Sequence, residues 1–156
     1  MSPNETTIHQ FFEALEKRDY KTLLACYSNN AVYHNQVMGL LDIDTTKAMW
    51  QLLCTGLPSL KTSYSNIQEL DEEYATCLWE EQYINNGKLI AKKNKAYLRF
   101  ENGLIIEHTD GFNFYDWCKQ TKGVVGWLFG WSTFMQKRIQ KKARTGLINY
   151  MNTLNK

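Results

Sequence analysis

The spacing of apolar residues changes character once along this chain, close to Pro58. Before that point apolar residues recur at helical spacing, which predicts helices over residues 7–18 and 45–55 and a short helix directly after Asp19. An alternating segment at 31–35 lies between them and predicts a short strand. The expected helix caps are Thr7, Asp19 and Asp44.

Beyond Pro58 the apolar period becomes two, which is typical of strands. The alternating runs are residues 60–70, 74–84, 89–100 and 104–115. Asn-Gly pairs at 86–87 and 102–103 separate the last three runs, and this dipeptide is a strong signal for tight hairpins. We therefore expect an α+β fold, with three N-terminal helices packed on one face of an antiparallel sheet.

The C-terminal part of the chain differs in charge from the rest. Residues 117–156 hold eight Lys and Arg and no acid, whereas residues 1–116 hold ten Lys and Arg and sixteen Asp and Glu. We expect a domain over residues 1–117 and a basic, aromatic-rich helical extension over residues 118–156 that packs on the same domain.

Within this extension, a short helix is expected to reach Lys122 and to be broken by Gly123 and Gly126. An aromatic segment at 124–131 follows, and a last helix over 133–154 begins with a capping box. The basic face of this helix has two interpretations: it is solvated, or residues 127–144 contact an anionic membrane, which is the less favoured alternative. The aromatic segment could equally cover a pocket or join two subunits.

Composition limits the class of protein. A chain of 156 residues with 44% hydrophobic residues has room for one domain with one core. No apolar run is long enough to span a bilayer, and no leader pattern is recognisable. Four scattered cysteines without metal spacing are typical of buried thiols in a reducing compartment, so we expect a cytoplasmic protein.

The segment GLIIEHTDGFNFYDW, residues 103–117, carries the candidate chemistry. Because strand side chains alternate, His108 and Asp110 are expected on one face with Ile106 and Phe112. An acid–base pair in the middle of an apolar face is typical of a functional site. It could also be a hydrogen-bond network that only satisfies the interior of the fold.

Four segments together resemble the SnoaL-like branch of the nuclear transport factor 2-like superfamily. They are IHQFFEALEKRD, YKTLLACYS, AVYHN and FENGLIIEHTDGFNF. The resemblance covers about residues 5–117 and implies a cone-shaped α+β roll that encloses a pocket. In the family the last segment lines the pocket as Gly-x-Ile-x-x-His-x-Asp, matched here by Gly103, Ile105 or Ile106, His108 and Asp110. A second acid that is frequent three residues later is replaced by Asn113.

The resemblance implies a chemistry as well. Relatives of the cyclase and isomerase type use a carboxylate to remove a proton next to a carbonyl, while hydrogen-bond donors stabilise the enolate. Asp110 is then the expected base and His108 its partner. Tyr33 or His34 would supply a further donor, depending on which face of the 31–35 strand points inward.

The strand at 74–84 offers pocket-lining residues of its own. Trp79 and Glu81 share a mostly apolar face and are expected to line the pocket, with Glu80 outside; a slip of one residue reverses this assignment. Glu81 could instead form an ion pair on a neighbouring strand. The candidate partners are Lys93, Lys95 and Arg99.

We therefore predict a protein that uses a pocket for a hydrophobic, carbonyl-bearing small molecule, with isomerase or cyclase chemistry as one outcome. The alternative is a non-catalytic ligand-binding or dimerisation module. The sequence contains no Gly-rich phosphate loop and no dinucleotide-binding motif, so no cofactor is expected. A metal site built from His34, His108 and Asp110 is conceivable, but no short-range ligand motif supports it. The resemblance implies a homodimer, and the overall charge argues against nucleic acid as a partner.

Overall fold

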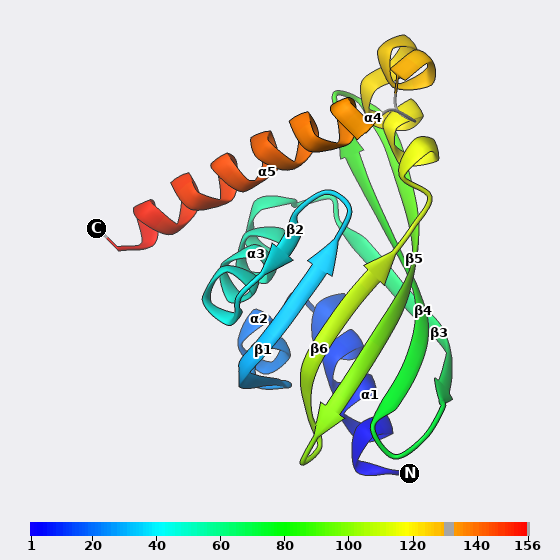
Figure 1. Cartoon of the computed structure of the whole chain (residues 1–156), viewed down its shortest axis with the longest axis vertical. Coiled ribbons are helices and arrows are strands. Elements are labelled where there is room, and N and C mark those ends of the chain that lie inside the picture. The colour runs from blue at the N-terminus through cyan, green and yellow to red at the C-terminus, as the bar shows by residue number, and fades with distance from the viewer. Residues whose placement is uncertain (130–132, 156) are drawn as a thin grey trace.

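The computed structural model describes residues 1–129 and 133–155, with side chains outside residues 122–135. Within these ranges the chain forms helices packed on one six-stranded curved sheet (Figure 1). The helices are α1 (Pro3–Glu16), α2 (Tyr20–Leu24), α3 (Ile43–Gly56), α4 (Phe114–Phe129) and α5 (Thr133–Leu154). The strands are β1 (Tyr27–Asn35), β2 (Gly39–Leu41), β3 (Lys61–Glu69), β4 (Tyr74–Asn85), β5 (Lys88–Glu101) and β6 (Leu104–Gly111).

The sheet has the strand order β2-β1-β6-β5-β4-β3. Strand β1 runs parallel to β6, and every other neighbouring pair in this described sheet is antiparallel. The residues at 86–87 and 102–103 have positive φ angles, as the tight turns of two-residue hairpins require. The predicted α+β roll and its four-stranded meander are confirmed, whereas β2 was not predicted.

The core lies between the sheet and the helices α1 and α3. Phe11 and Phe12 from α1 and Trp50 from α3 are almost completely buried against inward-facing side chains such as Leu98 and Ile105. Burying each such side chain contributes about 2 kcal/mol to the free energy of unfolding. This shared core fixes α1 and α3 over the concave face of the sheet.

Two of the three expected helix caps are wrong. Ser2, not Thr7, caps α1, because a proline in the first turn starts the helix earlier than its apolar stripe. Asp42, not Asp44, caps α3 and accepts a hydrogen bond from the first turn at 2.8 Å. Asp19 caps α2 as predicted.

The chain turns from strand to helix sooner than the alternation predicted. Strand β6 ends at Gly111 rather than at residue 115, and α4 begins at Phe114. The Asn113 side chain accepts a hydrogen bond from the first turn of α4 at 3.1 Å, which stabilises the start of that helix. Helix α4 then continues through Gly123 and Gly126, because a single glycine costs a helix only about 1 kcal/mol.

Helix α5 crosses over α3 on the side of β2 (Figure 1). Leu147 enters the main core, and Gln140 Nε2 donates to the carbonyl oxygen of Gln36 at 2.8 Å. The basic residues on its other side are exposed; they are Lys137, Arg138, Lys141, Lys142 and Arg144. Among the described helices, none combines the length and apolar character needed to cross a membrane. The side chains of the aromatic segment 124–131 and of the expected cap at Thr133 lie outside the described residues.

Candidate functional site

His108 and Asp110 project from the same face of β6 into the interior. Their exposed fractions are only 1% and 2%. His108 Nε2 lies 3.0 Å from Asp110 Oδ1, so the two side chains bind each other directly instead of only facing a common partner. The pair predicted from the alternation is therefore a bonded, enclosed pair.

A chain of hydrogen bonds connects α3 to this pair. Trp50 Nε1 donates to the Tyr27 hydroxyl at 2.9 Å, and this hydroxyl lies 2.7 Å from His108 Nδ1. The donor order that satisfies every group has Tyr27 donating to Nδ1 and His108 Nε2–H donating to Asp110. The imidazole is thus held at both ring nitrogens.

The Asp110 carboxylate accepts two further hydrogen bonds. The Tyr33 hydroxyl donates to Oδ2 at 2.6 Å, and Trp79 Nε1 donates to Oδ1 at 2.8 Å. Burial by itself raises the pKa of Asp110, but the electrostatic effect of His108 and the hydrogen bonds from His108, Tyr33 and Trp79 lower it below its ordinary value. Asp110 is therefore held as a carboxylate.

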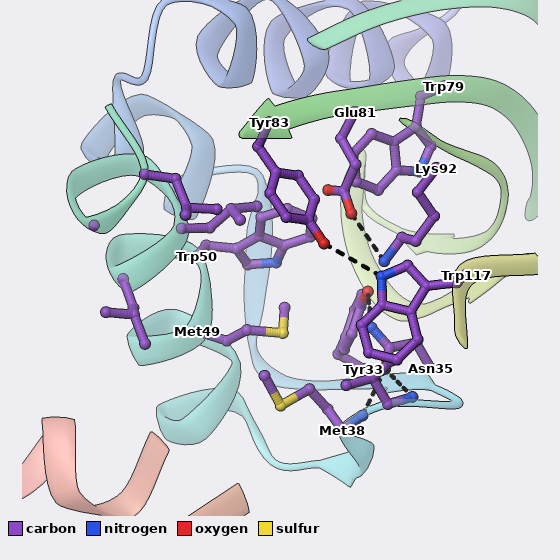
Figure 2. A pocket seen from close by; sticks show the side chains of 15 residues that line it. Tyr33, Asn35, Met38, Met49, Trp50, Trp79, Glu81, Tyr83, Lys92 and Trp117 are labelled. Atoms are coloured by element: carbon purple, nitrogen blue, oxygen red, sulfur yellow. Dashed lines mark hydrogen bonds and ion pairs between the residues drawn. The ribbon is translucent and has the colours of Figure 1, made fainter. Parts of the chain in front are cut away.

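A cavity of about 330 Å³ lies on the other side of these aromatic rings (Figure 2). Tyr33, Trp50 and Trp79 line it, whereas His108 and Asp110 are not among its lining residues. Each of the three lining rings hydrogen-bonds to the buried network, either to Asp110 directly or through Tyr27. The network therefore fixes one wall of the cavity from behind.

The cavity also contains a polar end. Glu81 Oε1 and Lys92 Nζ form an ion pair at 2.9 Å, and Trp117 Nε1 donates to the Tyr83 hydroxyl at 3.2 Å (Figure 2). Burial, together with Glu81, raises the pKa of Tyr83 despite the opposing effects of Trp117 and Lys92, so that hydroxyl is neutral. Much of the remaining lining is apolar and comes from α3, from the residue that follows this helix and from the β1–β2 connection; it includes Val37, Met38, Met49, Leu52, Leu53 and Leu57.

A family model described as a SnoaL-like domain matches residues 8–108, which is more than half of the chain. The chain belongs to the SnoaL-like family. No curated protein matches it.

Solved structures share the fold of this SnoaL-like protein. A nuclear transport factor 2-like protein of unknown function from Burkholderia pseudomallei K96243 is 19% identical, covers 79% of this chain and 100% of its own, and has a TM-score of 0.67. TerC, co-crystallised with polyporic acid, is 14% identical; the match covers 78% of this chain and 100% of TerC, with a TM-score of 0.67. A provisionally assigned polyketide cyclase from Pseudomonas putida KT2440 is 18% identical; the match covers 78% of this chain and 98% of the cyclase chain, with a TM-score of 0.63.

Several residues predicted to line the pocket of this SnoaL-like protein do so. Tyr33, Trp79 and Glu81 are lining residues. His34 is exposed on the opposite face of β1. Of the two residues considered from the sequence, it is therefore Tyr33 and not His34 that points inward. The Glu81 side chain points into the cavity as expected, but its ionic partner is Lys92 and not one of the three cations considered from the sequence.

Ile106 and Phe112 do not line this cavity. The pairing of β5 with β6 shifts by one residue between Arg99 and Phe100, so Ile106 forms a bulge and Ile105 takes the inward position. Phe112 lies beyond the end of β6, where its ring contacts the Lys92 ammonium group at 4.2 Å. Both predictions assumed an unbroken strand.

No sequence pattern singles out Tyr27 or Trp50 as partners of His108, because the three residues come from elements far apart in the chain. Lys92 could have been found. A two-residue turn at 86–87 pairs residues at equal distances on either side of it, and this places Glu81 opposite Lys92. Among the described residues, no group of three or more His, Cys, Asp or Glu side chains is arranged to hold a metal ion.

Proposed function

We propose that this protein binds a hydrophobic small molecule bearing a carbonyl group. The observation that carries the proposal is the cavity of about 330 Å³, with much apolar lining and a few polar groups at one end. Small-molecule sites typically have this size and this combination of side chains. TerC, a protein of the same fold, was co-crystallised with the small molecule polyporic acid, which is consistent with such a role.

A cavity-filling variant tests this proposal. Met49 points into the cavity in Figure 2, and Met49→Trp is expected to weaken binding of the neutral fluorescent probe N-phenyl-1-naphthylamine at least about tenfold, since the larger ring occupies the space. Leu89→Trp at an exposed position of β5 is the matched control and should leave the affinity unchanged. A folded Met49→Trp protein that binds the probe as well as the wild type would refute the site.

A second candidate function is proton abstraction next to the ligand's carbonyl group, with Asp110 as the base. The observation favouring it is that Tyr33 is a cavity-lining residue and that its hydroxyl donates to Asp110 Oδ2. The C–H proton would pass to the Tyr33 oxygen as Tyr33 gives its own proton to Oδ2. The C–H electron pair would form an enolate, and the enolate would then be reprotonated at another carbon or close a ring. Because its pKa is lowered, Asp110 is a weak base, so binding remains the first proposal.

We also propose that the protein is a cytoplasmic homodimer joined through the outer face of the sheet. Tyr74, Leu78 and Tyr97 are large, exposed side chains on neighbouring strands of that face. Light scattering at micromolar concentration should give twice the chain mass for the wild type and the chain mass for Leu78→Lys, because a charge in an apolar interface opposes association. A monomeric wild type would contradict the proposal.

A further inference from the structure

The ion pair between Glu81 and Lys92 is almost enclosed. Their side chains are 7% and 12% exposed, and both line the cavity. Removing two charges from water costs several kcal/mol per ion, and replacing such a pair by apolar residues is often neutral or stabilising. A contribution to the stability of the fold therefore explains the presence of this ion pair poorly. A role in ligand binding explains it better, because both residues line the cavity.

Lys92 retains donor capacity toward the cavity. Its ammonium group has three donors; one is used by Glu81, and the group lies 4.2 Å from the centre of the Phe112 ring. The Tyr83 hydroxyl accepts from Trp117 and keeps its own proton for an acceptor. Lys92 and Tyr83 therefore present two donors to an oxygen atom in the cavity.

We propose that Lys92 and Tyr83 bind a neutral oxygen of the ligand, a carbonyl or hydroxyl group, and that Glu81 excludes carboxylates from this position. This inference rests on the proposed binding function and specifies its ligand class. A neutral oxygen accepts from both donors while the charge of Lys92 stays balanced by Glu81. An anionic ligand would instead place a second negative charge beside Glu81 in a site shielded from water.

Two probes that differ by one sulfonate group test the proposal. N-phenyl-1-naphthylamine is neutral, and 1-anilinonaphthalene-8-sulfonate is its anionic counterpart. Glu81→Gln should increase the affinity for the anionic probe, relative to the neutral one, about tenfold, because Lys92 then lacks its counter-charge. The added Lys92→Met change should abolish that gain. Glu80→Gln, the same change on the neighbouring residue, should leave the ratio of affinities as in the wild type.

A competition experiment needs only the wild-type protein. Methyl 2-naphthoate should displace N-phenyl-1-naphthylamine at a concentration at least about tenfold lower than 2-naphthoate does. Equal displacement, or an unchanged affinity ratio in folded Glu81→Gln, would overturn the inference while leaving the binding function intact. Neutral-probe binding that Met49→Trp does not weaken would instead refute the binding function itself.

Discussion

Asp110→Asn is expected to lower the free energy of unfolding at pH 7 by about 3 kcal/mol. The carboxylate accepts hydrogen bonds from His108, Tyr33 and Trp79 inside the protein, and bonds to a buried charged group contribute about 1.5–3 kcal/mol each. The amide keeps one acceptor oxygen of the same shape, so part of the network survives. Urea unfolding of both proteins measures the difference.

The acid limb of the stability profile provides a second readout. The pKa of Asp110 is lower in the folded protein than in the unfolded chain. Its contribution is therefore fully present above the unfolded value, about 3.9, and is lost as the pH falls through the folded value. The difference in stability between wild type and Asp110→Asn should accordingly shrink as the pH is lowered below about 4.

Glu107→Gln is the matched control for this prediction, because it makes the same chemical change at an exposed position of the same strand. The pair that Glu107 forms with Arg99 lies at the surface, where such pairs contribute at most about 1 kcal/mol. An Asp110→Asn protein as stable as Glu107→Gln would show that the buried network does not hold the cavity wall.

Tyr33→Phe is expected to reduce enolisation in the cavity about 100-fold, if Asp110 acts through the Tyr33 hydroxyl. Proton transfer by a positioned group contributes about 10²–10⁴ in rate, and Tyr33 is the cavity-lining residue whose hydroxyl donates to Oδ2. Deuterium uptake from heavy water into 2-tetralone, followed by mass spectrometry, measures the rate above that in buffer.

Tyr97→Phe is the control, since it removes a hydroxyl from an exposed tyrosine on the outer face of the sheet. Its exchange rate should equal that of the wild type. Binding of N-phenyl-1-naphthylamine should persist in Tyr33→Phe, which separates lost chemistry from a lost site. Wild-type protein that binds this probe but does not accelerate exchange would reject enolisation and retain the binding proposal.

The sequence predicted those features that depend on local pattern. The two Asn-Gly turns determine the meander, and alternation along β4 placed Trp79 and Glu81 on the inner face. What could not be predicted depends on distant contacts. Nothing local to Tyr27 or Trp50 indicates that their polar groups meet at His108.

The same distinction explains the position of the acid–base pair. Alternation placed His108 and Asp110 on one buried face, which is confirmed, and the resemblance to the family placed them at the pocket. In the structure Tyr33 and Trp79 stand between Asp110 and the cavity. This arrangement depends on which aromatic rings from other strands reach the interior. It therefore cannot be predicted from the sequence of β6 alone.

The bulge at Ile106 also affects how this chain should be compared with others. Residues 104–105 and 107–111 follow two different registers against β5, so β6 consists of two short segments joined by one additional residue. An alignment that pairs β6 without a gap to a regular strand would match either Ile105 or His108 correctly, but not both. Sequence searches for the buried pair should therefore allow a variable spacing between Gly103 and His108. Deletion of Ile106 would leave a regular strand in which both segments keep their present orientation, because Ile105 and Glu107 already face opposite sides of the sheet.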